Sequence, residues 1–302
     1  MLTGYLHPLY AASLAEFGDP RQLPSSGGWI LQREIPGTNS LYDGMGTYPL
    51  FCCPDWSKLK YDLKALTNDL VSLSLVTDPF GDFNLSDLED SFDKVIPFKK
   101  HFVADMSTPV NELVSKRHRS DARRSLRKVV VEVSDNPYAY LDEWIELFSV
   151  LEKRHKIKAL RAFSRNAFAA QLQVPGLVMF KAVLGNELVG LDLWYVQDDV
   201  AQGHLAAFSP AGYETHASYA TKWTLIEYFK GKVSWINFGG APGGSADDGK
   251  GLGHFKRGWS NTTQMAYFCA KVLNPELYSK LDAAVGSHTD DYFPSYRRGE
   301  FL

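Results

Sequence analysis

The sequence predicts an α/β fold in which mixed, mostly antiparallel sheets are flanked by helices. Three strand-like runs follow one another across tight turns within 177–208, which indicates antiparallel neighbours. A helical pattern at about 215–230 separates the third run from a fourth at 233–238, and such a crossover gives a parallel pair. An antiparallel meander followed by a parallel pair predicts a mixed sheet in a layered α/β structure.

The first 110 residues alternate strand and helix signals, and we expect them to form a module of their own. Apolar residues spaced three and four apart predict a helix over 56–66, and Ser86–Glu89 has the pattern of a capping box. Strands are expected at 29–35, 71–76 and 101–106. The predicted domains are therefore 1–110 and 111–302.

The second module begins with a helical stretch that starts at Thr108-Pro109 and is expected to continue to Lys128. Its remaining elements follow in a regular order. Strands are predicted at 129–133, 177–184, 188–196, 200–208, 233–238 and 263–272, and helices at about 137–155, 164–172 and 215–230.

Composition excludes several classes of function. The chain has 302 residues, 45% of them hydrophobic, and a formal net charge of −3, which disfavours a dedicated DNA-binding protein. The N-terminus does not resemble a secretory signal, and no apolar run approaches the roughly 20 residues that span a bilayer. Cys52, Cys53 and Cys269 are expected to be reduced core thiols, which places the protein in the cytoplasm.

The first candidate site is the junction of a strand and a helix over 208–215. A helix that begins after a strand offers backbone N–H groups and partial positive charge to a phosphate, and Gly212 lets the backbone approach a ligand. The alternative is a plain connection in which Thr215 caps the helix.

The second candidate is the glycine-rich run that starts at Asn237 and ends at Trp259. It follows the carboxyl end of an apolar strand, where ligands of α/β sheets bind. It is neither a Walker motif nor a Rossmann fingerprint. The alternative is a surface loop in which Lys256 and Arg257 are solvated.

The third candidate is the basic segment 116–128, in which seven of thirteen residues are Lys or Arg. On a helix its cations form one stripe that could bind phosphates of a nucleotide, a coenzyme or RNA. The stripe consists of Lys116, Arg119, Arg123 and Arg127. No aromatic residue interleaves, so base stacking is not indicated, and a solvated helix face is the alternative.

Other chemistries have little support. No His/Cys/Asp/Glu group has metal-ligand spacing, so no metal is expected, and the serine-hydrolase elbow is missing. His204 and Asp192 fall in predicted strands, where each is either a buried base or a hydrogen-bonded core group.

The basic segment, the run 208–223, and Gly239-Gly240 followed by Phe255-Lys256-Arg257-Gly258-Trp259 together resemble the Fem-like, or BioF2-like, branch of the GNAT acyltransferases. The resemblance covers about residues 111–275. It implies tandem GNAT-like modules and attack of an amine on an activated acyl group, which is an acyl-CoA in ordinary GNAT enzymes and an aminoacyl-tRNA in the cell-wall peptidyltransferases.

Carried over to this chain, the resemblance makes Lys256 the catalytic candidate, alongside His204 and Asp192. Arg123 and Arg127 are candidates for binding substrate. The expected cofactor-binding residues are Gly212, Tyr213, Glu214, Thr215, Ser218, Gly239, Gly240 and Phe255. The chain departs from the family in two ways: 209–218 lacks the usual pyrophosphate-loop pattern, and the paired helical arm of some peptidyltransferases has no counterpart.

The leading hypothesis is transfer from acyl-CoA, with acetyl-CoA first, to an amine or hydroxyl of a sugar or amino acid, as a small molecule or cell-envelope precursor. The second is an aminoacyl-tRNA-dependent peptidyltransferase. The third is a non-catalytic binding module on the same fold.

Overall fold

The computed structural model describes residues 1–155, 162–240, 251–286 and 292–300. Backbone contacts group them into two compact units, each made of several segments. The first unit contains residues 1–4, 99–155, 162–240 and 251–265, and the second contains 5–98, 266–286 and 292–300. Strands β5 (Lys94–Asp105) and β11 (Thr262–Val272) contribute residues to both units. The division expected near residue 110, into domains 1–110 and 111–302, stays a prediction.

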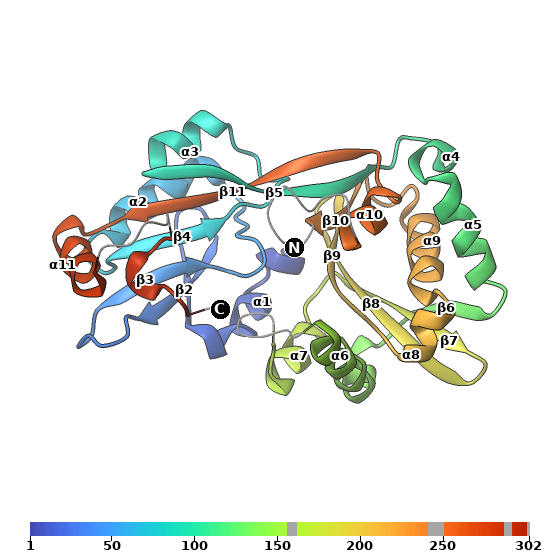
Figure 1. Cartoon of the computed structure of the whole chain (residues 1–302). Coiled ribbons are helices and arrows are strands. Elements are labelled where there is room, and N and C mark those ends of the chain that lie inside the picture. Colours follow the sequence, from blue (N-terminus) through green and yellow to red (C-terminus); the bar gives the residue numbers. More distant parts are fainter. Residues whose placement is uncertain (156–161, 241–250, 287–291, 301–302) are drawn as a thin grey trace. The chain divides into compact units, whose positions relative to one another are not determined.

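The sheet of the first unit has the predicted meander and parallel pair. Its strand order is β5-β10-β9-β8-β7-β6, and all neighbours are antiparallel except β9 and β10. The bounds are β6 (Val129–Ser134), β7 (Leu177–Leu184), β8 (Glu187–Gln197), β9 (Val200–Phe208) and β10 (Trp235–Gly240). The fold class is confirmed: a mixed, mostly antiparallel sheet is flanked by helices in the GNAT-like manner (Figure 1).

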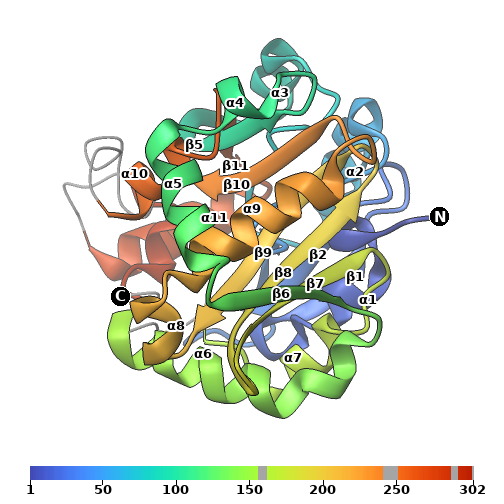
Figure 2. The same ribbon diagram turned by 90° about the vertical axis from the view of Figure 1, so that its right-hand side faces the viewer.

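Helices cover both faces of this sheet (Figure 2). Trp194 and Tyr195 are neighbours on β8 and therefore point to opposite faces. The Trp194 ring packs on Phe229 of α9, whereas the Tyr195 hydroxyl donates to the Gln171 carbonyl of α7 at 2.9 Å. One face is thus covered by α9 (Ala217–Phe229), on which α5 (Lys116–Ser125) packs, and the other by α6 (Leu141–His155) and α7 (Arg165–Gln171).

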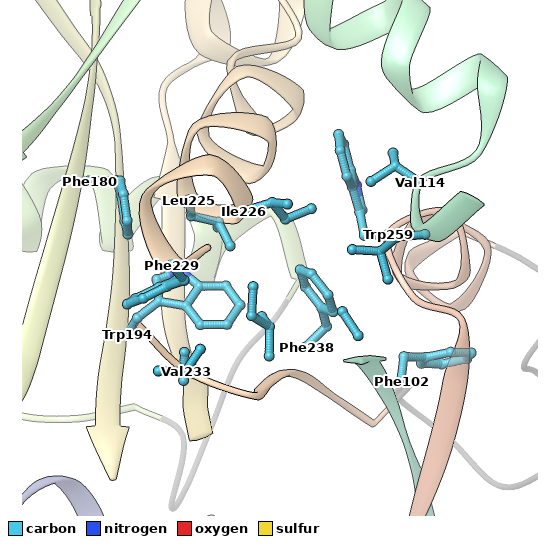
Figure 3. Packing of buried hydrophobic residues seen from close by; sticks show 14 of the residues in the cluster. Phe102, Val114, Phe180, Trp194, Leu225, Ile226, Phe229, Val233, Phe238 and Trp259 are labelled. Carbon is cyan, nitrogen blue, oxygen red and sulfur yellow. The ribbon is translucent and has the colours of Figure 1, made fainter. Parts of the chain in front are cut away.

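An aromatic core fills the space between the sheet and α9 (Figure 3). Trp194 lies edge-on to Phe238 of β10 with ring centroids 5.6 Å apart, and Phe180 of β7 lies edge-on to Phe229 at 5.9 Å. Full burial of each large apolar side chain stabilises the fold by roughly 1.5–3 kcal/mol. This core therefore holds β10 and α9 in a fixed relation.

Three sequence-based expectations about helices are wrong in detail. The stretch from residue 108 is broken into α4 (Val110–Leu113) and α5, because Ser115 is extended and caps α5 by accepting from the His118 N–H. Helix α5 ends at Ser125, so Arg127 lies beyond it. The glycine-rich run, expected to be a loop, contains the short helix α10 (Leu252–Arg257).

The predicted helix over 215–230 is present as α9. Helix α8 (Pro210–Glu214) precedes α9, and His216 between them has a left-handed φ of 57°. The backbone therefore changes direction where the long helix begins.

In the second unit the strands are neighbours in the order β1-β2-β3-β4-β11, which is one part of an 11-stranded sheet. Here β3 and β4 form the parallel pair. The bounds are β1 (Asp19–Gln22), β2 (Trp29–Glu34), β3 (Tyr42–Gly46) and β4 (Ser72–Val76), with helices α1 (Pro8–Ala12), α2 (Leu59–Leu66), α3 (Leu85–Ser91) and α11 (Pro275–Val285). The strands and helix expected at 29–35, 71–76 and 56–66 are present.

Two further observations concern the described residues. Cys52, Cys53 and Cys269 are buried and unbridged. None of the described helices combines the length and the apolar character needed to cross a membrane.

Candidate functional site

The parallel strands β9 and β10 separate after three paired residues each, near the start of β9 and toward the carboxyl end of β10. They pair only over Val200–Gln202 and Trp235–Asn237, after which β9 continues to Phe208 and β10 to Gly240. The register of β10 against β5 also shifts between Asn237 and Gly240. The carboxyl ends of parallel strands are the usual ligand position in α/β sheets, so this is the first place to look for a site.

Lys256 reaches this position from α10. Its Nζ donates to the Gly240 carbonyl at 2.7 Å. The neighbouring Phe255 packs edge-on against Tyr219 of α9, with ring centroids 5.0 Å apart, and lies near Trp259. As expected from the sequence, Phe255 anchors the segment that carries Lys256.

The Lys256 amine is poised to exchange a proton at neutral pH. Burial of the ammonium, and to a lesser extent the positive charges of Lys222 and Lys99, lower its pKa to about 7. A lysine with this pKa is present in both protonation states near pH 7 and can act either as a proton acceptor or as a cationic donor.

Sequence reasoning missed a set of buried polar groups beside Lys256. Asn237 of β10 contacts His101 of β5 and Gln202 of β9, and all three are buried. Burial and the Lys256 charge lower the pKa of His101 to about 4, so its ring is neutral. Polar residues at inward positions of otherwise apolar strands were the available signal.

Asp192 and His204, the other two catalytic candidates, are not brought together. Asp192 is buried on the α9 side, where it pairs with Lys222 of α9 and accepts from the Trp194 indole N–H at 2.8 Å. His204 lies on the opposite face, with Nε2 3.2 Å from Gln171 Oε1 and its ring 4.9 Å from that of Tyr195. Burial lowers the pKa of His204 to about 3, so this imidazole is also neutral.

At the strand–helix junction, the reason for Gly212 differs from the one expected. A Cβ here would lie 2.3 Å from the Val189 carbonyl oxygen, so the glycine permits close packing on β8. Its N–H donates to Ser209 Oγ, which caps α8. The Thr215 hydroxyl donates to the Ala211 carbonyl at 2.7 Å, so the proposed cap at Thr215 is wrong as well.

The remaining junction residues surround the start of α9. The Tyr213 ring lies under the Arg154 guanidinium at 4.1 Å, and Glu214 is exposed. Ser218 is half-buried in the first turn of α9, and its carbonyl accepts from Thr221.

A basic groove of about 640 Å³ lies between α5 and the first turn of α9. It is lined by Lys116, Arg117, Ser120, Asp121, Arg124, His216 and Tyr219. Three cations and a helix N-terminus are a suitable environment for a phosphate. Asp121 offsets part of the charge, 3.2 Å from Arg124 and 3.9 Å from Arg117.

The groove and Lys256 are joined through one aromatic contact, because Tyr219 lines the groove and packs on Phe255. Arg123 and Arg127 are exposed and do not line the groove. Residues 241–250, part of the predicted glycine-rich site, lie outside the described residues. Within the part of the chain that the structure describes, no group of His, Cys, Asp and Glu side chains could hold a metal ion.

Comparison with known proteins agrees with this geometry. Residues 114–257 match the family described as acetyltransferase (GNAT) domain. No curated protein sequence matches the chain.

Solved structures resemble the chain over almost its whole length. The crystal structure of FemX superposes with a TM-score of 0.66 at 15% identity, covering 90% of this chain and 93% of FemX. The C-terminal domain of an Agrobacterium fabrum protein described as a lysylphosphatidylglycerol synthetase gives 0.64 at 16% identity, covering 91% of each chain. L-PGS from Bacillus licheniformis gives 0.59 at 14% identity, covering 93% of this chain and 96% of that one.

The family match contains the groove, both parallel strands and Lys256, while the structural likeness extends to both units. Residues 114–257 are therefore similar to the GNAT acetyltransferase family, and the chain as a whole has a fold like that of FemX.

Proposed function

We propose that the chain is an acyltransferase that moves an acyl group from acyl-CoA to an amine, or a hydroxyl, of a sugar or amino-acid acceptor. Acetyl-CoA is the first candidate donor, and the acceptor is a small molecule or a cell-envelope precursor. The observation that carries the proposal is the Lys256 ammonium held on the Gly240 carbonyl where β9 and β10 separate.

The donor's phosphates would bind in the basic groove at the start of α9. Lys116, Arg117 and Arg124 supply charge there, and the α9 N-terminus supplies backbone N–H groups. The acyl end would pass Tyr219 and Phe255 toward Lys256, since these two rings lie between the groove and the lysine.

The reaction would need a proton acceptor and a stabilised oxyanion. The acceptor nitrogen bonds to the thioester carbon, the C–S bond breaks, and the proton lost by the nitrogen ends on the thiolate of CoA. As an ammonium, Lys256 would stabilise charge on the carbonyl oxygen, and as a neutral amine it would accept the proton. Asp192 and His204 stay candidates for the proton-accepting role.

Thiol release from acetyl-CoA and longer acyl-CoAs, measured with a panel of amino sugars and amino acids, tests the proposal. We expect turnover with at least one pair, strongly reduced in Lys256→Met. Thiol release that is the same in Lys256→Met as in the wild type would contradict the role given to this lysine.

An aminoacyl-tRNA donor is the second candidate. The observation that favours it is the exposed basic surface of α5 and the residues after it, including Arg123 and Arg127, which exceeds what one coenzyme needs. Binding of tRNA that falls steeply with salt would support this donor, because each neutralised phosphate releases counterions. Tight acyl-CoA binding that is unaffected by ribonuclease would support acyl-CoA as the donor.

A chain that binds a donor yet turns over with no acceptor would fit the third candidate, a non-catalytic module. We also propose a cytoplasmic location, which agrees with the three unbridged thiols.

A further inference from the structure

The turn that holds Lys256 is bonded to the side chain of Asn237. Gly239 has a left-handed φ of 76°, and its N–H donates to Oδ1 of Asn237 at 2.9 Å. This bond lies where the register of β10 against β5 shifts, so the Asn237 amide bonds a backbone group at the irregularity in the ladder. The following residue, Gly240, presents its carbonyl to Lys256 Nζ at 2.7 Å.

The Asn237 amide has only one satisfactory orientation. A backbone N–H can only donate, so the atom that faces Gly239 must be the oxygen. The amide nitrogen then donates to Gln202 Oε1, 2.7 Å away. The side chain is 2% exposed, so solvent does not offer it other partners.

This orientation also determines the hydrogen-bonding direction of His101. Its Nδ1 lies 3.1 Å from the same Asn237 oxygen, which accepts and cannot donate. His101 therefore carries its proton on Nδ1, and Nε2 is the acceptor.

Neighbouring side chains leave little space for larger residues in the turn. A Cβ on Gly239 would lie 3.2 Å from Lys256 Nζ, and one on Gly240 would lie 3.2 Å from the Lys99 side chain. The turn, the lysine and the buried amide thus form one closely packed group.

We propose that Asn237 is a positioning residue for Lys256, whose amide holds the Gly239–Gly240 turn in the conformation that presents the Gly240 carbonyl to the ammonium. The inference rests on the proposed function only in giving Lys256 a catalytic role. The contacts themselves exist whatever the donor.

The electrostatic surroundings make the proposal measurable. Among the described residues, the ionisable groups around Lys256 are Lys99 and His101 on β5 and Lys222 on α9, and Lys222 is paired with Asp192. Two of these groups are cations and His101 is neutral, so a carboxylate in place of the Asn237 amide would add an opposite charge next to the turn. Such a charge favours the ammonium form of Lys256.

The test is trace labelling of Lys256 with isotopic acetic anhydride across pH, read by mass spectrometry of its tryptic peptide. Asn237→Asp keeps the shape and the acceptor for Gly239. We expect the pKa of Lys256 to rise by about one unit or more, which makes labelling about fivefold slower or more at pH 7, because the neutral fraction of the amine falls. Asn237→Ala removes the acceptor for Gly239 without adding a charge. If the amide holds the turn, the pKa of Lys256 should fall in this variant, because the Gly240 carbonyl no longer accepts from the ammonium, whereas a purely structural role would lower the melting temperature and leave this pKa unchanged.

Two further variants complete the test. Gln202→Glu puts the charge one contact further away and should give a smaller shift in the same direction, which covers the case that Asn237→Asp does not fold. Asn261→Asp is the matched control, because Asn261 is exposed and bonds the Asp105 N–H and Thr108, not the turn. Labelling curves for Asn237→Asp and Gln202→Glu that coincide with the control would overturn the proposal.

Labelling needs no turnover, so this result is independent of the proposed function. If the chain transfers acyl groups, the pH profile of kcat/KM should move to higher pH in Asn237→Asp. If it transfers none with any donor, the labelling still decides the role of Asn237.

Discussion

At the scale of single residues, the chemistry depends on the setting of Lys256. The Phe-Lys-Arg-Gly-Trp run identified this lysine from sequence, but not its lowered pKa. That property comes from burial and from Lys99 and Lys222, which are distant in sequence and meet Lys256 only in the fold. The hydrogen bond to Gly240 likewise depends on a turn held by Asn237.

Replacing Lys256 with Met should lower kcat by about 10²–10³-fold, the usual cost of losing one positioned electrostatic donor. Steady-state kinetics with the best donor and acceptor measures this. Lys280→Met is the control, because Lys280 is an exposed lysine paired with Glu276 on α11. Equal rates for both variants would show that Lys256 takes no part.

The same variant should be more stable than the wild type at low pH. The folded-state pKa of Lys256 is about 7 and its ordinary value is 10.5, so between these values the folded chain binds fewer protons than the unfolded chain. The loss of folding stability caused by burying the ammonium is fully present below pH 7 and disappears by about pH 10.5.

Lys256→Met should therefore melt a few degrees above the wild type at pH 6, and the difference should vanish as the pH approaches 10.5. Melting curves of both proteins from pH 6 to 10.5 test this sign. A variant that melts lower at pH 6 would mean that the ammonium is well solvated or paired.

At the scale of elements, the site lies where strands separate and helices begin. The point at which β10 leaves β9, the first turn of α9 and the short helix α10 contribute to it, while other strand residues build the core. The long helix α9 starts only after the left-handed His216, and this residue lines the groove.

The groove predicts a difference between two variants that lose the same charge. Lys116→Gln with Arg124→Gln removes two cations from its lining, and Arg123→Gln with Arg127→Gln removes two exposed cations outside it. Since one charge-assisted hydrogen bond contributes about 1.5–3 kcal/mol, we expect the first pair to raise the donor KM at least tenfold.

Arg123 and Arg127 were predicted from the sequence to bind substrate, but replacing both with Gln should raise the donor KM much less. If the Arg123→Gln, Arg127→Gln variant raised the donor KM more than the other pair, the donor would bind on the basic stripe and not in the groove. An unchanged donor KM in both variants would show that the cations of α5 are solvated and bind no donor.

At the scale of the whole molecule, two units with similar mixed sheets differ in what their polar groups do. In the second unit, Arg297 forms a buried pair with Asp43, with Nε and Nη2 2.5 and 2.9 Å from the two carboxylate oxygens. Arg297 also donates to the Glu34 carbonyl at 2.7 Å, so residues near the C-terminus are fastened to β2 and β3.

Arg297→Met should lower the free energy of unfolding by about 3–5 kcal/mol, because it leaves Asp43 buried without its partner. Arg21→Met removes the half-exposed pair with Asp69 and should cost less than about 1 kcal/mol. Urea unfolding of both variants measures the contrast. Similar losses would mean that the Arg297 pair is solvated.

Much of the fold could be predicted from the sequence, because strands with strong apolar patterns such as 177–184 and 200–208 form where local pattern and tertiary packing agree. The sequence-based predictions are wrong where tertiary contacts determine where a helix begins or ends. Helix α10 forms after Gly251 in a glycine-rich run, and α5 stops at Ser125 although the basic pattern continues.

Some residues of the candidate site could likewise be predicted from the sequence, and others could not. Lys256 and Phe255 were found through a contiguous motif, whereas His101, Gln202 and Asn237 come from three strands and are joined only by pairing in the sheet. Asp192 and His204 were chosen for their residue type alone, and the irregularity in the β8–β9 register at His204 places them on opposite faces.

The measurement that tests the central claim most directly is isothermal titration of the wild type and of the Lys116→Gln, Arg124→Gln variant with acetyl-CoA and longer acyl-CoAs. If a phosphate-bearing acyl donor occupies the groove at the start of α9, at least one acyl-CoA binds the wild type, and the variant binds it at least tenfold more weakly. No binding of any acyl-CoA to the wild type at millimolar concentration would contradict the account.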